Sequence, residues 1–223
     1  MTEQQLDRQV LASWQRNAVP WAQAVREGSI ASRRTVTDQA IVSAILAKNP
    51  ASLLDIGCGE GWLARALAAE GVRVTGVDAI AELVAQARAL GGGDFLVCAY
   101  GELEAAALPV CDLAVCNFSL IGKESVEAVF RQVRGLLRPG GHVLVQTLHP
   151  VTACGDQPYQ DGWREGSWAG FDGGFVDPPP WYFRTLAGWQ ALFDRFGYTC
   201  LELAEPRRAA GEPPLSVIFT LGL

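Results

Sequence analysis

The sequence is short of the residues that build metal sites, and it has no apolar run long enough to span a membrane. It contains only two histidines, and no two of its six cysteines have Cys-x-x-Cys spacing. Structural zinc sites use such spacings, so we expect no metal site and reduced thiols that pack as small apolar residues. The polar, acidic first residues are unlike a signal peptide, and no apolar stretch approaches bilayer length. We therefore expect a cytoplasmic protein.

The sequence also lacks an excess of positive charge. It has 18 Lys and Arg against 24 Asp and Glu, a net charge of −6. Nucleic-acid binding needs a basic surface, so we expect no nucleic-acid partner. At 223 residues, of which 49% are apolar, the chain is long enough for one large globular domain with its own core.

The most informative stretch is LLDIGCGEGW, residues 53–62. A short apolar run typical of a buried parallel strand leads into Gly57, Gly59 and Gly61, and a helical pattern follows. A strand, a glycine-rich turn and a helix allow backbone amides to approach a ligand closely. The alternative is a tight turn that binds nothing, but three glycines weaken a turn unless something requires the space.

Two readings of this glycine motif compete. The dinucleotide fingerprint is Gly-x-Gly-x-x-Gly, followed about twenty residues later by an acidic residue. Here the third glycine comes one residue early, and Trp62 stands where the fingerprint requires a small residue. Asp78 does end the next predicted strand, and its carboxylate can accept hydrogen bonds from both hydroxyls of a ribose. The pattern favours a ribose-containing cofactor over a dinucleotide.

From residue 51 onward, strand and helix patterns alternate. Predicted strands lie at 53–57, 72–78, 94–98, 112–116 and 142–148, and predicted helical segments lie at 61–70, 80–90, 102–107 and 124–137. Repeated strand–helix units with short connections imply a parallel sheet with helices on both faces.

The two ends of the chain extend this core. Residues 3–27 read as a helix that Pro20 should kink or divide, and a second helix, capped by Thr35 or Thr37, should stop at Asn49-Pro50. Near the other end we predict a helix at 186–196 with Thr185 as its N-cap, then two strands around a Pro-rich turn. The N-terminal helices could pack on the sheet or serve as a lid.

Residues 150–184 break the alternation. They are rich in Gly, Pro and Asp, yet contain eight aromatic side chains. Long loops in compact domains are usually functional or disordered, and disorder disfavours aromatics. We therefore predict an aromatic cover over an acceptor pocket; the alternative is a small hydrophobic sub-core. The predicted organisation is a helical lid at 1–50, a core at 51–149, the cover at 150–184, and a closing helix and hairpin at 185–223.

The glycine motif carries a resemblance to a known family. D-I-G-C-G-E-G, with V-D at the end of the next strand, resembles the class I S-adenosylmethionine-dependent methyltransferases, and D-L-A-V-C-N-F-S-L and L-L-R-P-G-G-H-V-L-V agree with it. The similarity covers residues 50–149 and, more weakly, the chain's end, and is nearest to the small-molecule branch that includes ubiquinone and menaquinone biosynthesis methyltransferases. It implies an α/β, Rossmann-like, doubly wound seven-stranded sheet, mostly parallel with the last strand antiparallel.

The resemblance implies S-adenosyl-L-methionine as the cofactor and S-adenosyl-L-homocysteine as its product. The backbone at Gly57 and Gly59 would lie along the methionine part, and Asp55 would hold its ammonium group. Arg33 or Arg34 would approach its carboxylate.

Further implied contacts come from the ends of the second and fourth predicted strands. Asp78 would bind the ribose hydroxyls, and Ala79 or Ile80 would cover one face of the adenine. Asn117 would lie near the other side of the cofactor.

One position departs from the family pattern. The family commonly has an Asp after the third strand that meets the adenine amino group. This chain has Tyr100-Gly101 there, with Glu102 just beyond, so these three residues are the candidates for that contact.

His149 is the candidate catalytic residue, because it follows the fifth predicted strand, at the sheet edge where open α/β sheets bind ligands. A general base is needed only if the acceptor must lose a proton. The alternative is a histidine that holds the start of the following loop through backbone hydrogen bonds. Among the loop acids, Asp161, Glu165 and Asp172 could contact a polar acceptor, although solvated acids are the ordinary case.

The favoured function is methyl transfer to a small molecule. One alternative is a regulator that binds the cofactor without catalysis. A nucleic-acid methyltransferase is disfavoured by the acidic balance and by NFSL, which stands where an (Asp/Asn)-Pro-Pro-(Tyr/Phe) motif would follow the fourth strand. A nicotinamide-dependent oxidoreductase is the remaining alternative.

Overall fold

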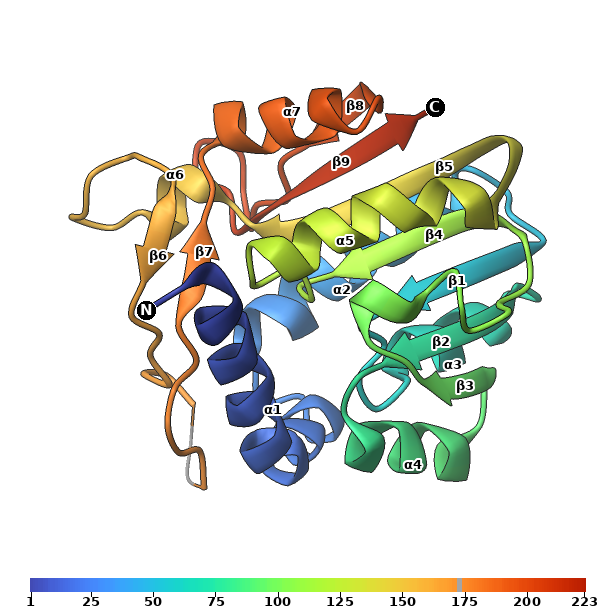
Figure 1. The fold of residues 1–223 in the computed structure, drawn as a ribbon, viewed down its shortest axis with the longest axis horizontal. Coiled ribbons are helices and arrows are strands. Elements are labelled where there is room, and N and C mark those ends of the chain that lie inside the picture. Colours follow the sequence, from blue (N-terminus) through green and yellow to red (C-terminus); the bar gives the residue numbers. More distant parts are fainter. Residues whose placement is uncertain (172–173) are drawn as a thin grey trace.

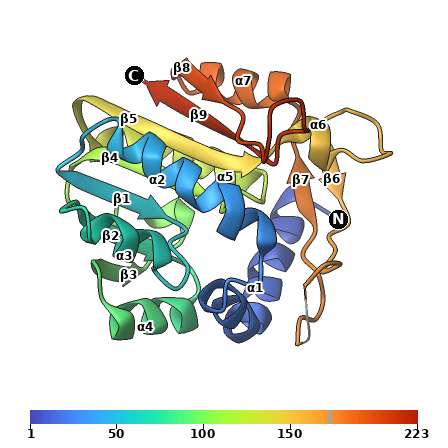
Figure 2. The ribbon, with the colours of Figure 1, turned by 180° about the vertical axis from the view of Figure 1, so that it is seen from behind.

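The computed structural model describes residues 1–171 and 174–223, and a seven-stranded sheet with helices on both faces forms its centre (Figure 1, Figure 2). The strands are β1 (Ser52–Ile56), β2 (Arg73–Asp78), β3 (Asp94–Val97), β4 (Cys111–Asn117), β5 (Leu137–Leu148), β8 (Thr199–Ala204) and β9 (Ser216–Gly222). Their order is β3-β2-β1-β4-β5-β9-β8. Neighbours among β1 to β5 pair in parallel, and β9 is antiparallel to both β5 and β8. The predicted fold is confirmed.

The helical segments alternate with these strands. They are α1 (Glu3–Arg26), the π-helical turn η1 (Arg33–Thr37), α2 (Asp38–Leu46), α3 (Trp62–Ala68), α4 (Ala81–Leu90), the 3₁₀ turn η2 (Tyr100–Glu102), α5 (Glu124–Gln132), the 3₁₀ turn η3 (Val133–Leu136), α6 (Pro150–Ala153) and α7 (Leu186–Arg195). Within the two described segments of the chain, no helix is long and apolar enough to cross a membrane.

Two apolar layers hold the helices against the sheet. Ile45 of α2, Leu67 of α3 and Val84 of α4 belong to the cluster on one face, whereas Phe130 of α5 and Phe193 of α7 belong to the cluster on the other. Figure 1 shows α5 and α7 in front of the sheet, and Figure 2 shows α2 from the opposite side. Apolar burial on both faces is what a doubly wound sheet requires.

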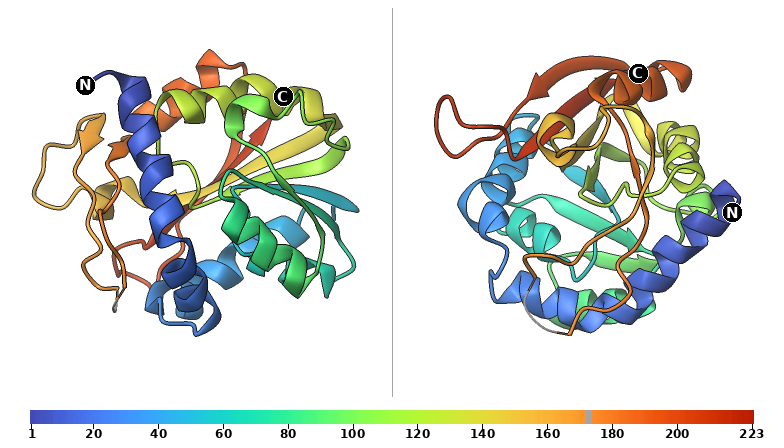
Figure 3. Two further views of the ribbon diagram at one scale, coloured as in Figure 1. Left: turned by 60° about the horizontal axis from the view of Figure 1, so that its bottom comes forward. Right: turned by 90° about the vertical axis from the view of Figure 1, so that its left-hand side faces the viewer.

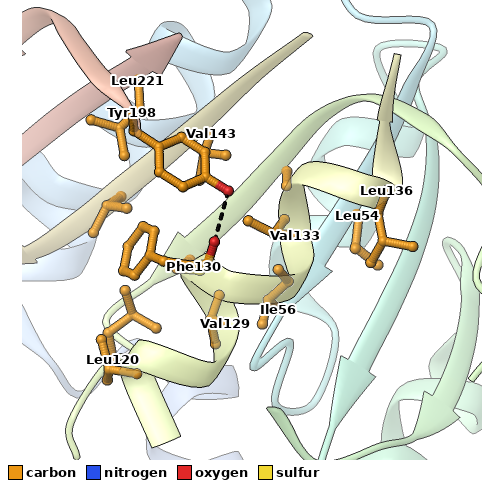
Figure 4. Packing of buried hydrophobic residues seen from close by; sticks show 14 of the residues in the cluster. Leu54, Ile56, Leu120, Val129, Phe130, Val133, Leu136, Val143, Tyr198 and Leu221 are labelled. Carbon is orange, nitrogen blue, oxygen red and sulfur yellow. Dashed lines mark hydrogen bonds between the residues drawn. The ribbon is translucent and has the colours of Figure 1, made fainter. Parts of the chain in front are cut away.

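Side chains along β1 point alternately into the two apolar layers. Leu53 packs in the cluster of α2 and α3, while Leu54 and Ile56 pack in the cluster of α5 and α7. Figure 4 shows this second cluster, where the Tyr198 hydroxyl donates to the Phe130 carbonyl oxygen at 3.0 Å. Because side chains alternate along a strand, Asp55 shares the face of Leu53.

The strand order determines where a ligand can bind. The chain crosses from β3, at one edge, back to β4, beside β1, so connections leave β1 and β4 toward opposite faces. Open sheets of this kind have their crevice outside the carboxyl ends of the strands at this switch point. Helix α1 stands across that edge (Figure 1, Figure 3).

The N-terminal helices differ from the prediction in two ways. Helix α1 is continuous through Pro20, so the proline does not divide it. Ala18 and Ala22 on either side are buried against Ile80 and Leu83, and this packing offsets the hydrogen bond that proline cannot donate.

The second helix has no side-chain cap of the predicted kind. Helical turns already begin at Ala31 and pass through η1. Thr37 does stand at the N-cap position of α2, as predicted, but its backbone is helical and its side chain makes no capping hydrogen bond. The Thr35 hydroxyl instead donates to the Ala31 carbonyl oxygen at 2.8 Å.

Two boundaries around β5 also differ. The predicted helix at 124–137 tightens into the 3₁₀ turn η3 after Gln132. Strand β5 begins at Leu137, not at His142, because Leu137 already pairs with Cys111 and the residues between form an irregularity in the ladder.

The described residues between 150 and 184 include regular secondary structure. After the short α6, strands β6 (Gly162–Arg164) and β7 (Trp181–Phe183) form an antiparallel hairpin that stands beside α1 (Figure 1, Figure 3). Their three-residue length is too short for a sequence periodicity to show.

Candidate functional site

The three glycines after β1 serve two different structural roles. All have positive φ: +79° at Gly57, +57° at Gly59 and +83° at Gly61. A Cβ on Gly57 would lie 2.3 Å from the Ser119 Cβ, and one on Gly61 would lie 2.9 Å from the Phe95 ring, so both are needed for close packing. A Cβ on Gly59 would meet nothing nearer than 3.9 Å. Of the three, Gly59 is therefore the one beside open space.

Asp78 ties this glycine loop to the end of β2. Its carboxylate accepts hydrogen bonds from the backbone N–H groups of Gly59 and Ile80, each at 2.9 Å. Burial raises the pKa of Asp78, and these backbone hydrogen bonds oppose the rise. Each carboxylate oxygen has a second lone-pair site, so the group can still accept hydrogen bonds from a ligand.

Ala79 and Ile80 continue from this point toward α1. Ile80 is buried and packs with Ala18 and Ala22 of α1. Ala79 is half-buried. The loop after β2 thus contacts the helix that crosses the sheet edge.

Asp55 is a buried carboxylate without a charged partner. It is 2% exposed, and no ion pair to it occurs among the described residues. Burial, and then the charge of Asp78, raise the pKa of Asp55 to about 7. A buried carboxylate needs a cation or donors to remain ionised, so this position suits a positively charged ligand group.

Unpaired oxygen atoms extend along the same face of the sheet edge. Asn117 and Gln146 are register partners on β4 and β5, so their side chains share a face. The Gln146 amide nitrogen donates to the Thr37 carbonyl oxygen at 3.2 Å and to the Ser216 hydroxyl at 2.9 Å. In the described part of the chain, Asn117 Oδ1, Gln146 Oε1 and the Thr37 hydroxyl are buried without a partner. Buried polar atoms are normally paired, so these are candidate ligand contacts.

Tyr100 reaches the glycine loop, whereas its two successors do not. The Tyr100 hydroxyl donates to the Ser119 carbonyl oxygen at 3.0 Å and lies 2.6 Å from where a Gly57 Cβ would be. Gly101 and Glu102 are exposed, and the Glu102 carboxylate accepts from the Ala99 N–H at 3.2 Å.

Of the two candidate arginines, Arg33 is the one beside the glycine motif. Its guanidinium stands 4.7 Å from the centre of the Trp62 ring, and its Nε donates to Asp38 at 2.9 Å. Arg34 is exposed. Both line a hollow of about 140 Å³ between the end of α1 and η1.

Aromatic side chains from α1, together with Trp168 and Phe171, cover the edge above Gly59. The Trp21 indole nitrogen is the atom nearest to a Gly59 Cβ. Trp21 packs against Trp14 and Phe171 at ring-centre distances of 5.0 and 6.0 Å, and Trp14 packs against Trp168 at 5.7 Å. Such pairs add to the apolar contact between the two segments.

Hydrogen bonds fix these two segments to each other. Asn17 of α1 donates from its amide nitrogen to the Val176 carbonyl oxygen at 2.8 Å, and its Oδ1 accepts from the Val176 N–H at 2.9 Å. The Ser13 hydroxyl donates to the Asp177 carbonyl oxygen. Helix α1 therefore forms one cover with the described residues at 168–171 and 174–177.

His149 lies at the carboxyl end of β5 and is 3% exposed. Its Nε2 is 3.0 Å from Glu205 Oε1, and its Nδ1 is buried with no partner within the described residues. Its carbonyl oxygen accepts from the Ala153 N–H at 2.8 Å, as expected of a residue that begins α6.

The loop acids do not gather at the glycine motif. Asp161 accepts from the backbone N–H and the hydroxyl of Thr185, both at 2.8 Å, and so anchors the start of α7, where Thr185 is the predicted N-cap. Glu165 is exposed, and Asp172 lies outside the described residues. Nowhere in the described ranges do three His, Cys, Asp or Glu side chains group so that they could hold a metal ion.

Sequence reasoning missed four residues of this site: Ser119, Trp21, Thr37 and Gln146. The sequence contains only indirect indications of these residues. Ser119 belongs to the NFSL segment after β4, and Trp21 is one of the apolar residues of a predicted lid. Which atoms they approach depends on how distant segments pack.

The comparisons with known proteins agree on a family. Residues 31–203 match the family described as "Methyltransferase domain". A ubiquinone biosynthesis O-methyltransferase of Xanthomonas axonopodis pv. citri is 35% identical over 118 residues, 51% of this chain and 49% of that protein. A second, of Xylella fastidiosa, is 34% identical over 109 residues, 47% of this chain and 44% of that protein. The chain thus spans about half the length of these curated relatives.

Solved structures share the fold. An S-adenosylmethionine-dependent methyltransferase from Mesorhizobium loti has a TM-score of 0.61 at 24% identity, over 80% of this chain and 95% of that one. The 1,6-didemethyltoxoflavin-N1-methyltransferase of Burkholderia thailandensis, solved with bound 1,6-didemethyltoxoflavin and S-adenosylhomocysteine, has a TM-score of 0.62 at 19% identity, over 92% of this chain and 85% of that one. The family match covers most of the chain, and the sheet order and glycine motif fit it. The chain belongs to the class I S-adenosylmethionine-dependent methyltransferases.

Proposed function

We propose that this protein binds S-adenosylmethionine and transfers its methyl group to a small-molecule acceptor. The observation that carries the proposal is Asp55, a buried carboxylate without a partner cation among the described residues, at the switch point of the sheet. An amino-acid ammonium group would supply the missing positive charge. The acidic net charge of −6 supports a small acceptor over a nucleic acid.

The residues at the edge fit this cofactor. Asp55 would hold the ammonium group, and the open space beside Gly59 would admit the methionine part, with Gly57 behind it. Asp78 would accept hydrogen bonds from the ribose hydroxyls with the lone pairs that the backbone leaves free. Asn117 Oδ1, which is buried and unpaired in the described chain, would accept a further hydrogen bond.

The remaining contacts follow from the same placement. Ala79 and Ile80 would cover the adenine, and Arg33, beside Trp62, is better placed than Arg34 for the cofactor carboxylate. Tyr100 would support the loop from below Gly57. For the adenine amino group, the candidate acid is Glu102, which lies in the 3₁₀ turn η2 with Tyr100. Its carboxylate would have to release the Ala99 N–H to accept a hydrogen bond from the adenine.

The cofactor supplies a methyl group on a sulfonium, which is already a good leaving group. The chain therefore has to hold the two reactants in line and exclude water. We assign the exclusion of water to the lid at 1–50 and the cover at 150–184, which the hydrogen bonds of Asn17 and Ser13 join above the core of 51–149. Residues 185–223 complete the sheet.

His149 is proposed as the general base for an acceptor that must lose a proton. Its Nε2 is held by Glu205 at 3.0 Å, which leaves the buried Nδ1 to accept a proton. A carboxylate bonded to one ring nitrogen fixes the tautomer and the orientation of the imidazole, which a general base requires.

Calorimetric titration with S-adenosylhomocysteine tests the cofactor assignment. We expect saturable binding by the wild type, at least tenfold weaker binding by Asp78→Asn, and unchanged binding by the matched control Asp94→Asn, whose side chain is exposed. Binding of NADH without binding of S-adenosylhomocysteine would support an oxidoreductase instead. Methylation of a panel of phenols, catechols and amines tests the activity; cofactor binding without any turnover would favour a regulator.

A further inference from the structure

Arg184 and the residues around it form a second polar feature. It lies on the face of the sheet covered by α5 and α7, opposite to the face of Asp55. Arg184 follows β7 and is 5% exposed. Its guanidinium donates to the Gly122 carbonyl oxygen at 3.0 Å, and its contact with the Lys123 carbonyl oxygen is 3.5 Å long. One of five N–H donors is therefore well bonded, because hydrogen bonds weaken steeply toward 3.5 Å.

The charge of Arg184 has no ion pair among the residues that the structure describes. Burial lowers the pKa of Arg184 to about 10, and Tyr182 and then three nearby acids oppose this change. Two of these acids are already used: Asp161 by Thr185, and Asp7 by the N–H of Lys123. A third, Glu127, pairs with Arg195 at 3.1 Å. Among the described residues, the close partners of Arg184 are therefore neutral carbonyl oxygens and aromatic rings, and no carboxylate is bonded to it.

Aromatic rings surround this guanidinium. The ring centres of Tyr182 and Trp189 lie 4.7 and 5.0 Å from its central carbon. Such contacts offset part of the desolvation. Each terminal nitrogen uses one N–H on a carbonyl oxygen, so within the described chain the Nε–H and one N–H of each terminal nitrogen are the donors left for an anion.

A cavity opens in front of Arg184. Its volume is about 20 Å³, and Thr147, Trp181, Trp189 and Leu120 are among its walls. This volume holds about one water molecule, so it would receive an oxygen atom of a carboxylate, with the rest of the acid at the mouth of the cavity. Helix α7, hairpin strand β7 and the end of β5 meet there (Figure 1).

The cavity adjoins the proposed methyl-transfer site through the loop after β4. Leu120 lines the cavity, and the residue before it, Ser119, is the one that packs on Gly57. The backbone N–H of Tyr182 donates to the Ile121 carbonyl oxygen at 2.8 Å, so the hairpin is fixed to the same loop.

We propose that Arg184 binds a carboxylate of the methyl acceptor in this cavity. The substrate class is then a small aromatic or otherwise planar organic acid, whose anion meets the guanidinium while its apolar part packs on the aromatic walls. The assignment as an acceptor group rests on the proposed methyltransferase function; the presence of an anion site does not.

Benzoate and benzamide, which have the same shape and differ in charge, test the anion site without knowledge of the acceptor. With ionic strength held constant, we expect benzoate to raise the melting temperature by about 3 °C at a tenfold excess over its Kd, and to change the tryptophan fluorescence. Benzamide should do neither. Equal shifts by both compounds would overturn the proposal.

Variants separate the anion site from the cofactor site. Arg184→Gln should lose the benzoate response, while Arg131→Gln, a matched change of an exposed arginine, should keep it. Both should bind S-adenosylhomocysteine as the wild type does. An undiminished benzoate response in Arg184→Gln would overturn the proposal, and failure of every protein to bind S-adenosylhomocysteine would refute the proposed function alone. If Arg184→Gln does not fold, the benzoate–benzamide difference in the wild type decides.

Discussion

Replacing Asp55 by Asn is expected to change stability and cofactor affinity in opposite directions. In the free protein the carboxylate is 2% exposed, and its pKa is about 7 against an ordinary value of 3.8. The unfolded chain therefore ionises near pH 4, while the folded chain retains the proton until about pH 7. Stability should fall as pH rises between these values and level off above them, because the folded state binds more protons there.

The size of this effect follows from the shift. Each pKa unit corresponds to about 1.4 kcal/mol, so the carboxylate costs the free protein on the order of 4 kcal/mol above pH 7. Asp55→Asn removes the ionisable group. Urea unfolding should show a wild type that loses stability from pH 5 to pH 8, and a variant that loses much less.

The same substitution, Asp55→Asn, should weaken cofactor binding. Removing one partner of a buried charge pair costs about 2 to 4 kcal/mol, or roughly 30- to 1000-fold in Kd. We therefore expect Asp55→Asn to bind S-adenosylhomocysteine that much more weakly in calorimetry. In the wild type, affinity should rise about tenfold per pH unit below pH 7, because binding requires the ionised form. A variant with wild-type affinity, or with the same loss of stability at high pH, would refute the assignment of Asp55.

Three further changes test the loop, the cover and the base. Gly57→Ala should destabilise the protein by about 2 to 4 kcal/mol in urea unfolding, because φ is +79° and the new Cβ would overlap Ser119; an unchanged midpoint would contradict this packing. Asn17→Leu removes both hydrogen bonds to Val176 and should speed limited proteolysis within residues 150–184 with cofactor affinity retained, whereas an unchanged cleavage rate would show that aromatic packing alone holds the cover. His149→Gln should lower kcat about 100-fold or more if the side chain is the base, with S-adenosylhomocysteine affinity unchanged, and undiminished turnover would remove that role.

The predictable part of the site is the part built from neighbouring residues. Gly57, Gly59 and Asp78 were predicted because a strand end, a turn and the next strand end are each local patterns. The structure adds a contact that was not predicted: the Gly59 N–H donates to the Asp78 carboxylate at 2.9 Å. The proposed roles of these residues toward a cofactor remain predictions.

Why each glycine of the loop is required could not be predicted from the sequence. Only the packing of Ser119 on Gly57 and of Phe95 on Gly61 shows that two of the three glycines serve the fold, and that Gly59 alone of them borders open space. These contacts join segments 30 or more residues apart in the chain, and no local pattern encodes them.

The amino-acid sequence by itself determined the order of strands and helices, the α/β class and the position of the glycine loop, because hydrophobic periodicity and turn residues act over a few positions. Tertiary structure alone decided that α1 covers the loop with Trp21, that β6 and β7 form a hairpin, and that Asp55 and Arg184 are buried without ion pairs within the described chain. Burial of a charge depends on every segment packed around it, so its cost, and the ligand charge that would offset it, emerge only once the chain has folded.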